Sequence, residues 1–233
     1  MPKLATPDSL DLPINDLSTP TYMRVSDLLR KDILAGRWPP GARLKIADLS
    51  QAYGVSQMPI REALQQLQGE GLLDIQPNRG ASIRTVDERL IINIYDLRGA
   101  IESMLVTRAA NSITEEQVIQ LYAIEARFEH ANAQSDTEAA LRANKSFHHL
   151  VNAIADNPEA LEILEKYSDL VSGLRRRFGF RPGRANQMMQ EHRQLLSALS
   201  THNAETACQI TMEHCRHAKE DLIALLRGEG PEQ

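Results

Sequence analysis

Four residues in the C-terminal part of the chain have the types and spacing of a metal site. Asn144 and His148 are four residues apart, so they share one face of a helix. His192 and His214 fall on two later helical segments, and side chains from facing helices can converge in the core of a bundle. Three imidazoles that leave coordination positions open fit Zn²⁺, Ni²⁺ or a similar divalent ion. A histidine on an apolar helix face is also a common core residue, so the spacing alone leaves both interpretations open.

A metal held by three histidines also describes a catalytic zinc centre, so a small metal-dependent hydrolase is a rival interpretation. The sequence contains no HExxH, GxSxG, P-loop or GxGxxG motif. Glu191 is the nearest candidate for a general base, but it precedes His192 directly, and adjacent helical residues point about 100° apart. We therefore expect a protein that is not an enzyme.

We assign no metal-binding or catalytic role to the other histidines or to the two cysteines. We expect surface or structural roles for the histidines at positions 130, 149, 202 and 217. Cys208 and Cys215 lie two helical turns apart, about 10 Å along a helix axis, which is too far for a disulfide. Both are predicted to be reduced thiols.

Helical periodicity alone runs through the chain from residue 87 onward. Breaks such as Asn157-Pro158, which combines a capping residue with a proline suited to the first helical turn, divide it into segments. An antiparallel bundle of about six helices joined by short loops is predicted. The segments are 87–111, 114–134, 136–155, 158–178, 184–200 and 203–227.

The preceding residues have the outline of a winged helix-turn-helix. Helices are predicted at 21–35, 46–53 and about 57–70, with Ser56 as a plausible N-cap, followed by strand-like runs at 72–75 and 81–86. The third helix can enter a major groove and present its N-terminal side chains to base edges. The hairpin tip, Asn78, Arg79 and Gly80, can approach the DNA backbone or minor groove, and Arg43 and Lys45 can contact phosphates.

Composition and charge support two domains with different partners. The net charge of the 233 residues is −5, yet residues 21–85 carry +3 and residues 86–233 carry −6. Aromatic residues are only 4%, which argues against an all-β fold. No run of 18 uncharged apolar residues and no secretory leader is present, so a cytoplasmic protein without membrane spans is predicted. We divide the chain into a flexible arm (1–20), a DNA-binding domain (21–86), a helical domain (87–228) and a tail (229–233).

The N-terminal residues resemble the GntR family of bacterial transcriptional regulators. The resemblance covers about residues 21–86 and rests on Gly54–Leu64 (GVSQMPIREAL), Leu67, Glu70-Gly71-Leu72 and Pro77–Gly80. It implies that Ser56, Gln57, Met58, Arg61 and Gly80 face DNA. Gln57 stands where arginine is usual and Ala47 where Glu or Arg is common. Because Gln pairs with adenine where Arg pairs with guanine, a shifted operator is expected.

The helical domain is similar to the FadR-type C-terminal ligand-binding (FCD) domain. The order Tyr95, Arg98 and Glu102, then Asn144 to His148, then Glu191-His192, then Met212 to His214 carries the resemblance over about residues 88–228. Many FCD domains hold a metal with one Asp and three His, and a carboxylate effector completes the coordination. The three histidines match, whereas Asn144 replaces the Asp. A neutral amide oxygen is a weaker ligand, so metal affinity is expected to fall.

The effector site and the mode of action follow from the same resemblance. Arg98, beside Tyr95, is a candidate clamp for an effector carboxylate, and the alternative for Arg98 is an ion pair with Glu102 one turn on. Within the basic run 175–177, one arginine could turn inward. We predict a homodimeric regulator, a repressor by resemblance, that binds double-stranded operator DNA and responds to a small organic acid bound with a divalent metal. A helical domain that only dimerises remains the alternative, although burying convergent polar residues without a ligand is costly.

Overall fold

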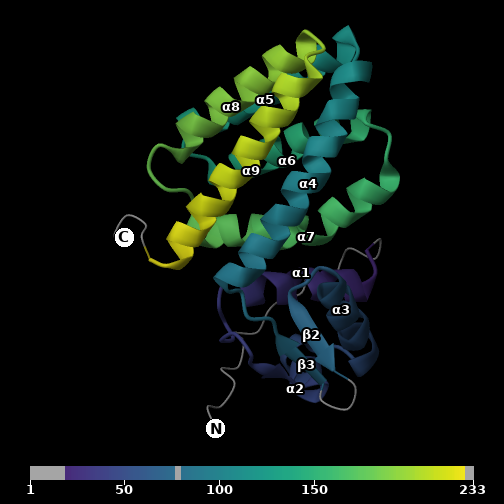
Figure 1. The fold of residues 1–233 in the computed structure, drawn as a ribbon. Helices are drawn as coiled ribbons and strands as arrows, with labels where there is room; N and C mark the ends of the chain where they lie inside the picture. Colours follow the sequence, from purple (N-terminus) through teal and green to yellow (C-terminus); the bar gives the residue numbers. More distant parts are fainter. Residues whose placement is uncertain (1–18, 77–79, 229–233) are drawn as a thin grey trace. The chain divides into compact units, whose positions relative to one another are not determined.

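The computed structural model describes residues 19–76 and 80–228. The chain divides between Thr85 and Val86 into two compact units, each of which is described by itself (Figure 1). The predicted arm, apart from Thr19 and Pro20, lies outside the described residues, as do Asn78, Arg79 and the tail 229–233.

The N-terminal unit packs three helices against a small antiparallel sheet whose strand order is β1-β3-β2. Its core is formed by apolar residues that recur every three or four positions along the helices. Among them are Val25, Leu29, Ile60 and Leu67, which are completely buried. The predicted hairpin is present, whereas β1 was not predicted because two residues are too few to show a period. The elements are α1 (Thr21–Leu34), β1 (Arg43–Leu44), α2 (Ile46–Tyr53), α3 (Gln57–Gly69), β2 (Leu73–Gln76) and β3 (Gly80–Ile83).

The turn between α2 and α3 determines how α3 is presented. Gly54 ends α2 in the left-handed region, with φ of 65°, a conformation that glycine adopts without steric cost. Ser56 occupies the N-cap position of α3 with extended backbone, as predicted, but its side chain makes no capping hydrogen bond. Pro59 lies in the first turn of α3, where its missing N–H leaves no helical bond unmade.

Residues 86–228 form six helices, and the structure confirms the mainly helical fold predicted for them. Asp87, Asp136, Asn157 and Asn203 each cap a helix by accepting a hydrogen bond from a backbone N–H, and Thr114 forms a capping box with Gln117. Among the described helices, none combines the length and the apolar character needed to cross a bilayer. The helices are α4 (Glu88–Ser112), α5 (Glu115–Ala133), α6 (Thr137–Ile154), α7 (Pro158–Phe178), α8 (Arg184–Ser200) and α9 (Ala204–Leu226).

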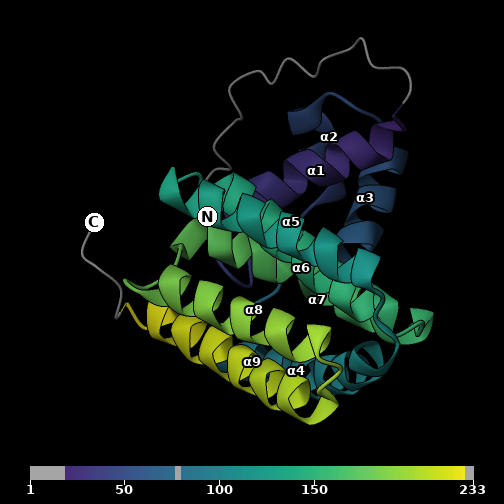
Figure 2. The same cartoon turned by 90° about the horizontal axis from the view of Figure 1, so that it is seen from above.

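The longest helices, α4 and α9, lie side by side and antiparallel (Figures 1 and 2). At one end Arg227 pairs with Glu88 at 2.6 Å, and at the other His202 Nδ1 lies 2.8 Å from the Ala110 carbonyl oxygen. One apolar core joins α4, α5, α6, α8 and α9, and Phe147 of α6 is fully buried in it. This packing turns one face of α6, α8 and α9 toward a shared interior.

Candidate metal centre and nucleic-acid interface

Three of the predicted ligands meet in the interior of the helical unit. His148 comes from α6, His192 from α8 and His214 from α9, and one ring nitrogen from each lies within 4.8 Å of the others. The ring centroids are 4.8 to 5.2 Å apart. Phe147 stacks on the His192 ring at 4.4 Å between centroids, so packing as well as hydrogen bonding fixes that imidazole. Helix packing thus brings together three side chains, of which the first and the last, His148 and His214, lie 66 residues apart in the chain.

Buried carboxylates orient two of these rings. The Nδ1 atom of His192 lies 2.7 Å from Glu125 Oε2, and the Nδ1 atom of His214 lies 2.7 Å from Glu191 Oε2. Because a carboxylate accepts, Nδ1 carries the proton in each case and Nε2 keeps its lone pair. Glu191 also contacts His217 Nδ1 at 2.7 Å and accepts two hydrogen bonds from Arg184.

Burial lowers the pKa of two histidines of this cluster, His148 and His214. The pKa of His148 is held well below its usual 6.5 by burial first, and then by the imidazoles of His214 and His192 and by Arg98 and Arg184. The pKa of His214 is lowered for the same reasons, with burial again the largest cause. Both imidazoles are therefore neutral near pH 7, the form in which a histidine binds a metal.

The residues present fit a divalent transition ion. Two buried acceptor atoms, Asn144 Oδ1 and His192 Nε2, have no hydrogen-bond partner among the described residues, although buried polar atoms are normally satisfied. Two nitrogens bound at about 2.1 Å to a tetrahedral ion lie about 3.4 Å apart. The ligand atoms, which lie within 4.8 Å of one another, thus need to approach by at most about 1.4 Å. Asn144 and the three histidines together form a set of neutral O and N donors.

A cavity of about 120 Å³ adjoins the histidines. At about 30 Å³ per water molecule, this volume corresponds to roughly four waters, enough for a small organic acid. Tyr95, Arg98, Asn144, His148 and His214 all line it. The predicted pair of Arg98 with Glu102 is present, with Arg98 Nε donating at 2.8 Å. Arg98 also lines the cavity, and its role as a carboxylate clamp stays a prediction. The Arg98 guanidinium also lies 5.3 Å from the Tyr95 ring centroid.

One arginine of the run 175–177 points inward. Arg175 is buried, lines the cavity, and pairs with the buried Asp221 of α9. It also donates to the Ala218 carbonyl oxygen at 2.8 Å and lies over the Phe180 ring. Arg176 instead forms an exposed pair with Glu138. Arg175 is therefore bound to protein groups at the cavity wall.

The predicted DNA-facing residues lie on the surface of the N-terminal unit. At the start of α3, Ser56, Gln57, Met58 and Arg61 are exposed, and Met58 keeps 64% of its surface. Their exposure leaves these side chains accessible to a duplex groove.

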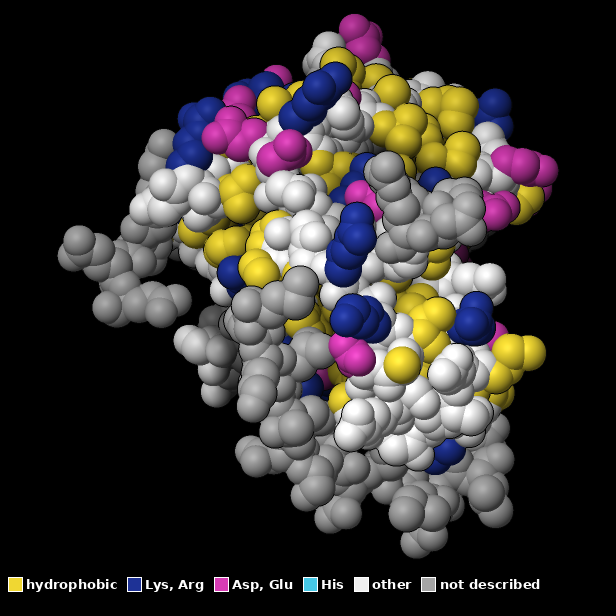
Figure 3. Space-filling view, turned by 90° about the horizontal axis from the view of Figure 1, so that it is seen from below, with side chains coloured by type: hydrophobic (Ala, Val, Ile, Leu, Met, Phe, Trp, Pro, Cys, Tyr) yellow, Lys and Arg dark blue, Asp and Glu magenta, His cyan; other side chains and the backbone are white. Residues whose placement is uncertain are grey.

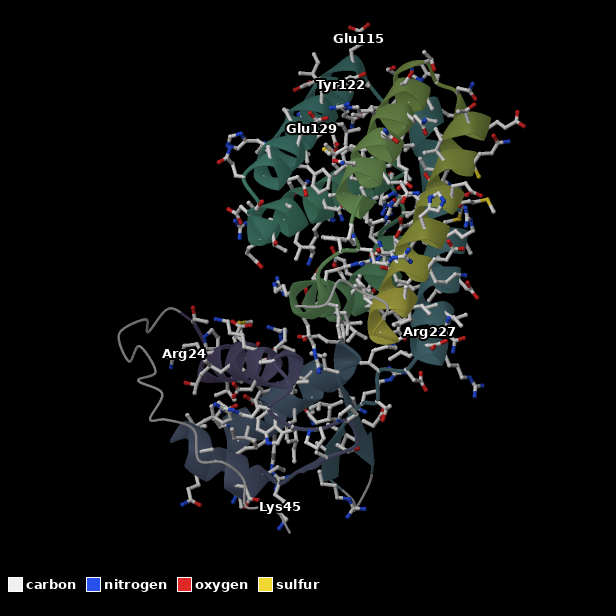
Figure 4. All side chains as sticks on the ribbon, turned by 90° about the vertical axis from the view of Figure 1, so that its left-hand side faces the viewer. Arg24, Lys45, Glu115, Tyr122, Glu129 and Arg227 are labelled. Atoms are coloured by element: carbon white, nitrogen blue, oxygen red, sulfur yellow. The ribbon has the colours of Figure 1, made fainter. Side chains whose placement is uncertain are left out.

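The cations around β1 and the glycine of the wing are also accessible. Arg43 and Lys45 flank the buried Leu44 and are exposed, and Lys45 points away from the ribbon (Figure 4). Gly80 is exposed at the start of β3, with φ of 78°. On the face shown in Figure 3, Lys and Arg side chains lie at separate positions among apolar and uncharged polar ones.

Sequence reasoning missed the supporting residues of the histidine cluster. Glu125 was not singled out, although it lies on the buried face of α5 between Leu121 and Phe128, at helical spacing from both. A charged residue on an apolar stripe was the available signal. His217 was expected to be structural, and it is half-buried against Glu191. Arg184 was not singled out either, although its partner Glu191 lies two turns further along the same helix, α8.

The other exclusions made from the sequence agree with the described residues. Both cysteines are free, and burial raises the pKa of the Cys215 thiol well above its usual value. Glu191 is engaged by Arg184, His214 and His217, so it is poorly placed to act as a hydrolytic base.

A winged helix-turn-helix unit followed by a helical bundle around a small polar cavity defines a DNA-binding regulator with an effector-binding domain. Residues 21–83 match the model of the bacterial regulatory proteins of the gntR family, and residues 93–217 match the FCD domain. The chain belongs to the GntR family and carries an FCD domain. It is a transcriptional regulator and not an enzyme.

Individual relatives support this assignment. The HTH-type transcriptional regulator YdhC of Bacillus subtilis is 32% identical over 219 residues, 93% of this chain and 97% of that protein. The HTH-type transcriptional repressor RspR of Escherichia coli is 26% identical over 203 residues, which cover 87% and 89% of the two chains. The solved structure of E. coli McbR/YncC has the same fold, with a TM-score of 0.70 at 21% identity over 91% of this chain and all of that one.

Proposed function

We propose that this protein is a homodimeric repressor whose operator affinity is controlled by a small carboxylate bound together with a divalent transition metal. The observation that carries the proposal is the meeting of His148, His192 and His214 beside a cavity. The cavity is lined by His148, His214, Arg98 and Asn144, and the Asn144 Oδ1 has no hydrogen-bond partner among the described residues. Repression as the sign of regulation is supported by the relative RspR, which is named a repressor.

The DNA-binding domain is proposed to span residues 21–86. In it, Ser56, Gln57, Met58 and Arg61 of the α3 region read base edges. Arg43 and Lys45, together with the wing residues Asn78, Arg79 and Gly80, contact the DNA backbone or the minor groove. The support is their exposure, for all but Asn78 and Arg79, which lie outside the described residues.

The effector domain is proposed to span residues 87–228. His148, His192 and His214 would hold the metal, with Asn144 as a weaker fourth ligand, and Zn²⁺ or Ni²⁺ suits these donors. Such an ion supplies a positive Lewis-acidic centre that attracts a carboxylate. Two further residues of the chain would contribute to effector binding. The planar guanidinium of Arg98 can bind both oxygens of an effector carboxylate, and Tyr95 lines the cavity.

Regulation would proceed by a shift between dimer geometries. A two-fold protein dimer matches the palindromic operators that such motifs read. An effector that binds one arrangement more tightly changes the population of the arrangement competent for DNA, and the residues at 86–89 connect the two units. Such a protein would act in the cytoplasm, where its DNA lies.

The experiment that tests this function combines metal content with DNA binding. Elemental analysis of untagged protein purified without chelator measures bound Zn and Ni. Fluorescence anisotropy with DNA selected from a random pool then measures operator affinity while a panel of short carboxylic acids is titrated in.

The expected result is one metal per chain and an acid that weakens DNA binding. His148→Ala should abolish the response to the acid and leave DNA affinity intact, whereas the control His130→Ala, at an exposed position of α5, should behave as wild type. A normal response in His148→Ala would overturn the proposed site.

A further inference from the structure

The buried charges of the helical unit do not balance. Four carboxylates are buried among the described residues, and three of them pair with an arginine: Glu102 with Arg98, Glu191 with Arg184 and Asp221 with Arg175. The fourth is Glu125, whose side chain is 3% exposed and contacts no arginine or lysine within the described residues, but only the neutral imidazole of His192. Its second oxygen, Oε1, has no hydrogen-bond partner there. An unpaired buried carboxylate is costly, so its position calls for a nearby positive charge.

The positions of Glu125 and Glu191 determine which ring nitrogen each histidine offers. Both carboxylates contact an Nδ1 atom at 2.7 Å, Glu125 that of His192 and Glu191 that of His214. Each therefore favours the tautomer with a proton on Nδ1 and a lone pair on Nε2. His192 Nε2 is buried without a partner, as expected for an atom kept available for a cation. Carboxylates that hold a ligand histidine in this way also raise its basicity.

The unbalanced charge and the substitution at position 144 compensate each other. A carboxylate at that position would place one negative charge on the metal, and the asparagine places none. Glu125 supplies one negative charge without a charged partner among the described residues, and the imidazole ring of His192 separates it from the centre. With a divalent ion bound, the fixed buried charge of the site becomes +1, which suits a singly charged carboxylate.

Resting on the metal binding proposed above, we propose that Glu125 and Glu191 are positioning residues of the metal centre, and that Glu125 replaces the charge missing at Asn144. Each carboxylate holds one ligand histidine through Nδ1 with Nε2 directed at the ion. Glu125 makes the neutral His148, His192, His214 and Asn144 set strong enough to bind a divalent cation without a directly coordinated carboxylate.

The first test measures the tautomers in metal-free protein. Long-range ¹H–¹⁵N NMR of the full chain, with ¹⁵N-labelled histidine and assignment by His192→Gln and His214→Gln, reports which ring nitrogen is protonated. The expected result is Nδ1–H for both rings. In Glu125→Gln the amide can present its oxygen or its NH₂ group, so the His192 signal should change while that of His214 stays. Protonation of His192 at Nε2 in the wild type would overturn the proposal, whether or not any variant folds.

The second test measures Zn²⁺ binding by calorimetry on the same full-length proteins. Glu125→Gln should weaken affinity 10- to 100-fold, the usual effect of removing such an outer carboxylate. The matched control is Glu129→Gln, one turn further along α5 (Figure 4), whose carboxylate pairs with Arg193, the neighbour of His192, at an exposed position. It should change affinity less than twofold. Adding Asn144→Asp to Glu125→Gln should restore most of the loss.

The outcomes separate this proposal from the proposed function. Equal Zn²⁺ affinity in Glu125→Gln and wild type would overturn the charge replacement. Failure of Asn144→Asp to rescue Glu125→Gln would do the same. Wild-type protein that shows the expected tautomers but binds no Zn²⁺ would overturn both the charge replacement by Glu125 and the metal part of the proposed function.

Discussion

The ion pair between Arg175 and Asp221 offers the sharpest test of how the helical unit is held together. It joins α7 to α9, and both side chains are only 5% exposed. Arg175→Met keeps most of the aliphatic stem beside Phe180 but removes the charge and the hydrogen bond to the Ala218 carbonyl oxygen. Asp221 would then be a buried carboxylate whose remaining described partner is the Arg181 backbone N–H, at 3.2 Å.

The expected loss of stability is large for Arg175→Met and small for Arg176→Met, the same substitution at the neighbouring residue. Removing one partner of a buried pair costs about 3–5 kcal/mol, because the other charge stays buried. Arg176→Met breaks a pair with Glu138 in which both side chains are 47% exposed, and exposed pairs contribute about 0–1 kcal/mol. The double variant Arg175→Met/Asp221→Asn removes both charges, so it should recover much of the loss.

The assay is urea unfolding at fixed protein concentration, followed by two probes. Circular dichroism at 222 nm reports mainly on the helical unit, and fluorescence of Trp38, the single tryptophan, reports on the N-terminal unit. Only the first signal should shift in Arg175→Met. Equal destabilisation by Arg175→Met and Arg176→Met, or no recovery in the double variant, would refute the reasoning.

Three further outcomes are expected. Arg61→Ala removes an exposed cation of α3 and should weaken binding to selected DNA by about 1–3 kcal/mol at constant salt, while the circular dichroism spectrum stays unchanged. Anisotropy titrations that match wild type would contradict the proposed base contact. Gly54→Ala forces alanine to φ of 65° and should destabilise the N-terminal unit by about 1 kcal/mol in Trp38 fluorescence, whereas an unchanged midpoint would argue against the left-handed turn. The pKa values of His148 and His214 are depressed in the folded protein, so below about pH 6.5 the unfolded chain binds protons that the folded chain does not. Chelator-treated protein should therefore lose stability when the pH is lowered from 7.5 to 5.5. A helical unit that is equally stable at the two pH values would contradict this expectation.

Local residue chemistry was sufficient to predict most of the fold. The helix 46–53 was predicted to its exact bounds, because Gly54 ends it in a conformation that glycine adopts freely. The start at Pro158 followed from a capping asparagine and a proline. One element was missed where the local signal was short, because β1 has only two residues.

The amino-acid sequence also indicated which residues are candidates for DNA binding and metal binding. The motif around Arg61 indicated α3 as the helix that reads DNA. Spacing made the histidines at 148, 192 and 214 possible metal ligands, and the resemblance to the FCD domain selected them. Such patterns are visible because residue type and helical spacing are local properties. They name candidates, but they contain no distance between segments that are far apart in the chain.

Only tertiary packing decided how those candidates meet. It placed the ring nitrogens of three helices within 4.8 Å of one another, and it placed Glu125 of α5 against His192 of α8. It also selected Arg175 as the inward arginine of three consecutive ones. The physical reason is that burial and charge pairing depend on which helix faces oppose each other, and the antiparallel packing of α4 against α9 and of α5 against α6 and α8 determines those faces. The sequence therefore determined the elements and the chemical groups, and the bundle determined their partners.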